Sequence, residues 1–224
     1  MIVTLDIETI GNADAVAKMP DPKPNGRLNK DPDKIARDVA EKKAAMITKA
    51  ALDPLTAQVA AFALVGIKDG AEHEYVEVIE QSTICHERDL LQKIFATLGY
   101  DGIRIVTWNG IGFDLPMIYK RAMILGVDPG NFGAPPLSAW TTRYRTDRHY
   151  DLMQIWGGWR DFAKLDTVAS IVLGQNKTEG FDVSTIAALI EQGTEGRAKV
   201  AEYCLQDTRL TWELWKRFSG FMFA

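Results

Sequence analysis

The chain has 224 residues, of which 46% are hydrophobic and 25% are charged, and its formal net charge is -4. This composition is ordinary for a globular protein, and the length suffices to bury a large core in one α/β domain. The negative charge argues against a protein that coats nucleic acid by bulk electrostatics, because that mode of binding requires many Lys and Arg contacts to phosphates.

Other classes are also disfavoured. The hydrophobic runs are short and interrupted by charges, so we expect no membrane-spanning segment. The N-terminal sequence MIVTLDIETIG lacks the charged start and long apolar stretch of a signal peptide, which predicts a cytoplasmic protein. Cys85 and Cys204 show no CxxC spacing and are expected to be free thiols. A metal site built from histidines is not expected, because His73, His86 and His149 are not at ligand spacing.

Strand-like and helix-like segments alternate along the chain, which favours a sheet covered by helices. The first segment, residues 2–9, is predicted to be a strand with Asp6 and Glu8 on one face and Leu5 and Ile7 on the other. Further strands are predicted at 58–68, 73–80 and 104–108, the first two joined by a type I′ turn at Asp69-Gly70. Helices are predicted at 83–99, 114–125, near 164–173 and 183–192, and from about 195 to 218. Residues 127–150 are predicted to be rich in loops.

Residues 13–55 interrupt this alternation and are predicted to be a helical insertion between two strands. Residues 21–26 are rich in turn formers, and residues 33–48 have helical character with Lys and Glu mixed along them. A solvated helical excursion, a mobile flap and a partner surface all fit this composition.

The first motif with chemical potential is Asp6-Ile7-Glu8. Two carboxylates two residues apart on a strand point to the same side, and their like charges repel. A divalent cation would relieve that repulsion, since magnesium and manganese prefer hard oxygen ligands. The alternative is an exposed strand face on which both carboxylates are simply solvated.

The second motif runs from Asn109 to Asp114, after a buried strand and at the start of a helix. Ends of strands that face the start of a helix are where α/β sheets gather ligands. The alternative is structural: Asp114 would be the helix N-cap, with Pro116 in the first turn.

The third motif, Tyr203 to Asp207, lies in the final predicted helix. Residues four apart share one helix face, so Tyr203 and Asp207 are expected to lie together. An Asp within an otherwise apolar stripe needs a hydrogen-bond partner or a cation. A hydrogen bond to neighbouring backbone would meet that need without any catalytic role.

Taken together, the three motifs resemble those of the DEDD superfamily of exonucleases, which are DnaQ-like enzymes with a ribonuclease H-like fold. The family motif Asp-x-Glu-Thr matches Asp6–Thr9, Asn-x-x-x-Phe-Asp matches Asn109–Asp114, and Tyr-x-x-x-Asp matches Tyr203–Asp207. The resemblance spans nearly the whole chain. It implies an α/β, ribonuclease H-like fold with a mixed central sheet flanked by helices, formed as a single exonuclease domain over residues 1–224.

The third motif also indicates a subclass. Histidine-type members carry a His five residues before the last Asp, and Glu202 stands at that position here. Tyr203 instead fits the tyrosine type. The segments His149–Leu152 and Lys164–Asp166 are further similar to exonuclease domains related to family B DNA polymerases.

The resemblance implies a mechanism that uses two divalent cations, Mg²⁺ or Mn²⁺. Their ligands would be Asp6, Glu8, Asp114 and Asp207, and Tyr203 would orient the attacking water. The implied reaction removes nucleoside 5′-monophosphates from the 3′ ends of single-stranded DNA.

Substrate contacts are predicted in two places. Near the first two motifs, the residues expected to meet the terminal nucleotide are Thr9, Ile10, Asn109 and Phe113. Ile10 would wedge between the last two bases or pack in the ordinary way, and Phe113 has a core role as its alternative.

The second place is the basic stretch 143–148. Arg143, Arg145 and Arg148 are predicted to contact phosphates, because mixed Arg and Tyr suit phosphate contact and base stacking. A charged surface loop is the alternative. Lys164 and Lys177 are weaker candidates for phosphate contacts.

Three rival functions stay open. A ribonuclease of the same architecture would trim RNA 3′ ends, although DNA is favoured as the substrate. A catalytically silent nucleic-acid-binding module would keep the fold as a scaffold. An endonuclease or resolvase on the related fold is disfavoured by the Tyr-x-x-x-Asp motif. A polymerase or a repair protein is the expected partner, and no membrane is involved.

Overall fold

The computed structural model describes residues 1–26, 31–68, 70–158, 160–175 and 181–222. Its centre is a five-stranded sheet with the order β3-β2-β1-β4-β5. The strands are β1 (Ile2–Gly11), β2 (Ala57–Lys68), β3 (Ala71–Val78), β4 (Arg104–Thr107) and β5 (His149–Asp151). β1 pairs antiparallel with β2 and parallel with β4, so the sheet is mixed, as the sequence predicts.

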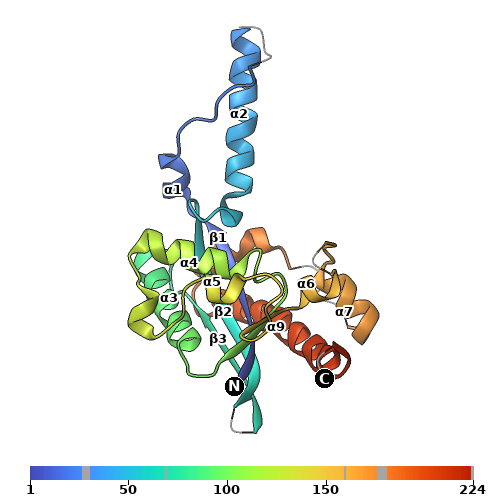
Figure 1. Ribbon diagram of the computed structural model, residues 1–224. Helices are drawn as coiled ribbons and strands as arrows, with labels where there is room; N and C mark the ends of the chain where they lie inside the picture. The colour runs from blue at the N-terminus through green and yellow to red at the C-terminus, as the bar shows by residue number, and fades with distance from the viewer. Residues whose placement is uncertain (27–30, 69, 159, 176–180, 223–224) are drawn as a thin grey trace.

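Helices cover both faces of this sheet (Figure 1). Two residues of β3 that point to opposite faces of the sheet show which helix lies on each side. Glu74 forms an ion pair with Arg209 of α9 (Thr194–Met222), whereas Glu77 forms one with Lys93 of α3 (Ile84–Leu98). Because successive side chains of a strand point to opposite faces in general, α9 covers one face and α3 covers the other.

The remaining helices follow the predicted order. The predicted helices at 114–125 and 164–173 are confirmed as α4 (Asp114–Leu125) and α7 (Leu165–Leu173). The region near 183–192 divides into a short 3₁₀ helix, η3 (Val183–Thr185), and α8 (Ile186–Glu191). Gly126 ends α4 with φ of 68°, a left-handed conformation that glycine adopts without steric cost.

The region 127–150 contains more regular structure than its sequence predicts. It includes η2 (Pro129–Phe132), α5 (Ser138–Thr141) and the start of β5, and α6 (Leu152–Trp156) follows at once. The missed strand β5 has only three residues, too few to show an alternating pattern. In the predicted turn at Asp69-Gly70, Gly70 has φ of 82° and Asp69 lies outside the described residues. Lys177, a weaker candidate for a phosphate contact, also lies outside them.

A buried ion pair ties the helices of one layer together. Arg121 of α4 donates two hydrogen bonds to Glu87 of α3, at 2.8 and 2.7 Å, and both side chains are almost completely buried. Glu87 also accepts the backbone N–H of Val59, and Arg121 donates to the carbonyl oxygen of Pro54. The pair therefore links both helices to β2 and to the segment that enters it.

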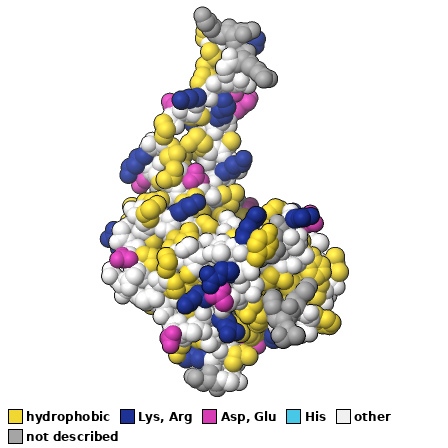
Figure 2. All heavy atoms as spheres, viewed as in Figure 1, with side chains coloured by type: hydrophobic (Ala, Val, Ile, Leu, Met, Phe, Trp, Pro, Cys, Tyr) yellow, Lys and Arg dark blue, Asp and Glu magenta, His cyan; other side chains and the backbone are white. Residues whose placement is uncertain are grey.

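The predicted insertion is an arm that projects from the body (Figure 1). It contains α1 (Ala13–Lys18) and α2 (Pro32–Thr48), neither of which has a buried residue, and η1 (Ala50–Leu52) at its base. The predicted helical character of 33–48 is confirmed. Figure 2 shows basic, acidic and hydrophobic side chains along the arm.

The arm begins where the strand of the first motif ends. The backbone N–H of Asn12 donates to Thr56 O at 2.7 Å, and the Thr9 hydroxyl donates to Ala51 O at 2.8 Å. Within the described part of the chain, no helix is both long enough and apolar enough to cross a membrane.

Candidate metal centre

The first motif lies on the face of β1 that α9 covers. Leu5 and Ile7 point into the core with 1% and 5% exposure, whereas Asp6 and Glu8 are half-buried. Ligand atoms of Asp6, Glu8 and Cys204 of α9 all lie within 4.8 Å of one another. The strand alternation predicted from sequence thus delivers both carboxylates to one point against the last helix.

The third motif meets the first through α9. The Cys204 thiol lies 3.9 Å from the backbone oxygen of Asp6. Burial, followed by the charges of Asp207, Glu8 and Asp6, raises the pKa of the Tyr203 hydroxyl well above its usual value. Asp207 itself is 6% exposed. Tyr203 therefore lies within the field of three carboxylates and remains protonated at neutral pH.

The second motif places Asp114 against β1. Burial is the largest cause that raises the pKa of Asp114 to about 7, and the charge of Asp151 adds to the rise. Two hydrogen bonds oppose the rise, one with the backbone of Asp114 itself and one with the backbone of Ile7, which lies between the two residues of the first motif. Asp114 is the first residue of α4 and not its N-cap; the cap position is Phe113, which makes no side-chain capping bond. The structural alternative for Asp114 is therefore wrong.

The charges of all four carboxylates affect the pKa of one buried side chain, the Cys204 thiol. Burial is the largest cause that raises the pKa of the Cys204 thiol, and the charges of Asp6, Glu8, Asp207 and Asp114 follow in that order. The three motifs, which are separated by most of the chain, thus converge around Cys204.

This donor set fits a hard divalent cation. Carboxylate oxygens are the ligands that magnesium and manganese prefer. A thiol binds metal only as the thiolate, and the raised pKa keeps Cys204 protonated. The carboxylates are thus the groups that could hold such a cation, and the protonated Cys204 thiol lies beside them.

Asp151, which the sequence reasoning did not assign to the site, supports the second motif. Its carboxylate accepts the backbone N–H groups of Asn109 at 3.0 Å and Ile111 at 2.9 Å. Asn109 has φ of 73°, an uncommon conformation for a residue other than glycine. An added Cβ on Gly112 would lie 2.4 Å from the Asn109 amide oxygen, so any larger residue there would displace the Asn109 side chain.

A second buried chain of hydrogen bonds fixes the start of the same loop. Nδ1 of His149 lies 2.7 Å from the carbonyl oxygen of Trp140, so this nitrogen must carry the proton. Nε2 then accepts from the Thr107 hydroxyl at 2.8 Å, and Thr107 accepts the N–H of Gly110. Burial lowers the pKa of His149, in keeping with a neutral ring.

The predicted contacts of the terminal nucleotide lie in different environments. Asn109 and Phe113 are half-buried next to Asp114, and Phe113 also packs against the core. Thr9 is half-buried and bonded to the base of the arm. Ile10 is only 4% exposed and packs in the hydrophobic core. This burial contradicts the wedge role predicted for Ile10 and agrees with the alternative of ordinary packing.

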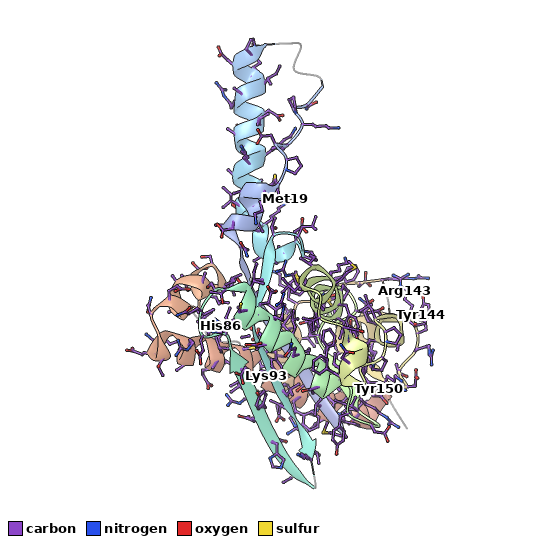
Figure 3. The ribbon with its side chains drawn as sticks, turned by 90° about the vertical axis from the view of Figure 1, so that its left-hand side faces the viewer. Met19, His86, Lys93, Arg143, Tyr144 and Tyr150 are labelled. Carbon is purple, nitrogen blue, oxygen red and sulfur yellow. The ribbon has the colours of Figure 1, made fainter. Side chains whose placement is uncertain are left out.

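The basic stretch lies on the surface. It enters β5 at the amino end of the strand, whereas Asp151 and the second motif lie at the carboxyl end. Arg143 and Arg148 are exposed, and Arg145 pairs with Asp147 at 3.0 Å. Figure 3 shows Arg143 and Tyr144 reaching outward from this loop. The structure does not bring these arginines together with the carboxylates.

The strand order and the carboxylates gathered from β1, α4 and α9 define an α/β protein of the ribonuclease H-like class with an acidic site that could hold a cation. The chain belongs to the family described as "Predicted 3'-5' exonuclease related to the exonuclease domain of PolB", which matches residues 52–222. Asp114, Tyr203 and Asp207 lie inside the matched region, and Asp6 and Glu8 precede it.

The fold is also that of a part of a solved structure. The family B DNA polymerase from the hyperthermophilic archaeon Pyrobaculum calidifontis matches 97% of this chain with a TM-score of 0.57 and 21% sequence identity, over 24% of its own chain. This likeness confirms the predicted ribonuclease H-like fold.

Curated relatives are DNA polymerases. The chain is 29% identical over 157 residues to the DNA polymerase of Thermococcus litoralis, covering 64% of this chain and 9% of the polymerase. It is 31% identical over 121 residues to DNA polymerase 1 of Aeropyrum pernix, covering 49% of this chain and 12% of that protein. The DNA polymerase catalytic subunit of Epstein-Barr virus is 29% identical over 167 residues, which cover 65% of this chain and 16% of the subunit. The chain thus spans only a small part of each of these proteins.

Proposed function

We propose that the protein is a 3′-5′ exonuclease that removes nucleoside 5′-monophosphates from the 3′ ends of single-stranded DNA. In this proposal residues 1–224 act as one exonuclease domain. The observation that carries it is the convergence of Asp6, Glu8, Asp114 and Asp207 around Cys204, next to Tyr203. An acidic cluster of this kind would be electrostatically costly without cations that also bind a phosphodiester.

The proposed cofactors are two Mg²⁺ or Mn²⁺ ions. Asp6, Glu8 and Asp207 would hold one, and Asp6 and Asp114 the other. When bound, such ions supply Lewis acidity at the phosphate and lower the pKa of a bound water.

The protein's own contribution is positioning. The Tyr203 hydroxyl, kept protonated by its surroundings, would orient the attacking water and would not act as a base. Asp151 would hold the second motif so that Asp114 faces Asp6 and Glu8. Thr9, Asn109 and Phe113 remain the proposed contacts for the terminal nucleotide.

The three arginines of the basic stretch are proposed to meet phosphates farther along the strand. Arg143 and Arg148 are exposed and suited to this, whereas Arg145 would first have to leave Asp147. DNA is proposed over RNA because the relatives bear the name of DNA polymerases. A polymerase or a repair protein is the proposed partner.

The test uses the full chain with 5′-labelled single-stranded DNA and Mg²⁺ or Mn²⁺. We expect a ladder that shortens from the 3′ end, free 5′-monophosphates, and no cleavage with EDTA or with the isosteric variant Asp207→Asn. Faster shortening of a matched RNA would favour the exoribonuclease instead. Cleavage of circular single-stranded DNA would contradict an exonuclease, and no cleavage in any arm would favour a silent binding module.

A further inference from the structure

Two aromatic rings stack at the edge of the carboxylate cluster. Phe181, which directly precedes the turn into η3, lies face to face with Tyr203 of α9, with ring centroids 4.1 Å apart and an interplanar angle of 11°. None of the three motifs includes Phe181. We propose that Phe181 is a positioning residue that fixes the ring of Tyr203 and thereby the place of its hydroxyl.

The geometry restricts Tyr203 in a specific way. The hydroxyl of a tyrosine lies on the axis that joins Cβ to the ring, so its place is set by the torsion about Cα–Cβ, which has three staggered wells. A parallel ring at 4.1 Å covers one face of Tyr203, so it blocks any swing of the whole side chain towards that face, and a change to another well would break the stack. The stack thereby helps to fix where the hydroxyl lies relative to Asp6, Glu8 and Asp207.

Phe181 is itself held firmly enough to serve as a support. The next residue, Asp182, accepts the N–H of Ser184 on its side chain at 2.9 Å and the N–H of Thr185 on its carbonyl oxygen at 2.9 Å. The half-buried ring packs against the hydrophobic core. Ile186 and Ile190, both fully buried, then fix α8 in place. The backbone that carries Phe181 is therefore anchored on its C-terminal side.

The role of Phe181 is indirect, since a benzyl group can neither bind a cation through oxygen nor transfer a proton. It acts through Tyr203. This inference rests on the proposed function, in which Tyr203 orients the attacking water. The expected defect is in kcat and not in KM, because the hydroxyl is misplaced for the chemical step while cation ligands and nucleotide contacts are retained.

The experiment compares four substitutions of Phe181 in the full chain. Phe181→Tyr and Phe181→Trp keep a flat ring, whereas Phe181→Leu and Phe181→Ala do not. With labelled single-stranded DNA, we expect Phe181→Ala and Phe181→Leu to lower kcat by about tenfold to a hundredfold, with KM nearly unchanged and the chain still folded at the assay temperature. The two aromatic variants should retain most of the rate.

A double-mutant cycle separates positioning from a general structural effect. In a Tyr203→Phe background no hydroxyl is left to misplace, so Phe181→Ala should cause little further loss. An equal loss in both backgrounds would overturn the proposal. So would full recovery by Phe181→Leu, because that result would indicate mere space filling.

A second readout does not depend on activity. The chain has 6 tyrosines, and fluorotyrosine labelling with Tyr203→Phe as reference assigns the ¹⁹F resonance of Tyr203. Loss of the stacked ring should shift and broaden this resonance in Phe181→Ala but not in Phe181→Trp, and an unchanged resonance would refute the stack. An inactive wild-type chain would refute the proposed function, whereas an active wild type with an equally active Phe181→Ala variant would refute the role of Phe181 alone.

Discussion

The carboxylate of Asp151 accepts the backbone N–H of Asn109, a residue 42 positions earlier in the chain. This hydrogen bond supports Asn109 in its left-handed conformation, and the other carboxylate oxygen of Asp151 accepts the backbone N–H of Ile111. The loop held in this way leads directly into Asp114. A residue on a three-residue strand therefore governs the placement of a proposed metal ligand.

Replacing Asp151 with Asn tests this support. Only one side-chain oxygen would remain for three N–H donors, those of Asn109, Ile111 and Gln154, and the new amide group would face at least one of them. We expect the free energy of unfolding to fall by about 1–3 kcal/mol and the cleavage rate to fall with it. Urea denaturation of the cation-free protein measures the first effect. Asp101→Asn, at an exposed turn position, is the matched control, and equal stability of both variants would contradict the role of Asp151.

The buried pair of Glu87 and Arg121 should matter far more than the surface pairs. Arg121→Met leaves the Glu87 carboxylate buried without its cation, so we expect a loss of about 3–5 kcal/mol in the free energy of unfolding. Lys34→Met, which breaks the exposed pair with Asp31, should lower the free energy of unfolding by about 1 kcal/mol or less. Chemical denaturation of both variants checks the contrast. Similar losses in the two would show that burial of the ion pair is unimportant.

Cation binding should depend on pH through Asp114. Its pKa of about 7 means that the carboxyl is largely protonated below neutrality until a cation displaces the proton. We therefore expect Mn²⁺ affinity to rise as pH increases from 6 to 8, with proton release on binding. Calorimetry in buffers of different ionisation enthalpy measures both. Asp114→Asn should remove most of the pH dependence, and a wild type without it would contradict the prediction.

His149 predicts a pH effect on stability of the cation-free protein. Burial lowers its folded pKa below the ordinary value of 6.5, so below pH 6.5 the unfolded chain binds the additional proton. The contribution of His149 to stability is thus fully present above pH 6.5 and is lost as pH falls towards its folded pKa. Denaturation between pH 5 and 8, compared with His149→Gln, should show this slope in the wild type alone. The same slope in both proteins would exclude His149 as its source.

The arm should be removable without loss of the fold. Its helices α1 and α2 bury no residue, and an added Cβ on Gly11 would lie only 2.9 Å from Ala50, so the two ends of the arm are adjacent. Replacing residues 13–49 by a short Gly/Ser linker should change the free energy of unfolding by no more than about 1 kcal/mol. Circular dichroism and denaturation provide the measurement. An unfolded product would show that the arm contributes to the core.

Much of this protein could be predicted from its sequence. Alternation along β1 indicates that Asp6 and Glu8 share a face, and the spacing of Tyr203 and Asp207 indicates a common helix face. The predicted boundaries of α4 and α7 agree with the structure to within a residue. These features depend on interactions between residues a few positions apart, and such interactions leave a periodic pattern in the chain.

The tertiary structure decided the rest. The packing of helices against β1 places Ile10 in the core, contrary to its predicted contact with the substrate. Asp151 and Phe181 lie outside the three motifs, and each contributes only through a distant partner. No local pattern encodes such contacts, because they depend on how separate elements pack: Asp151 meets Asn109 only once β5 pairs with β4, and Phe181 meets Tyr203 only once the chain before η3 packs against α9.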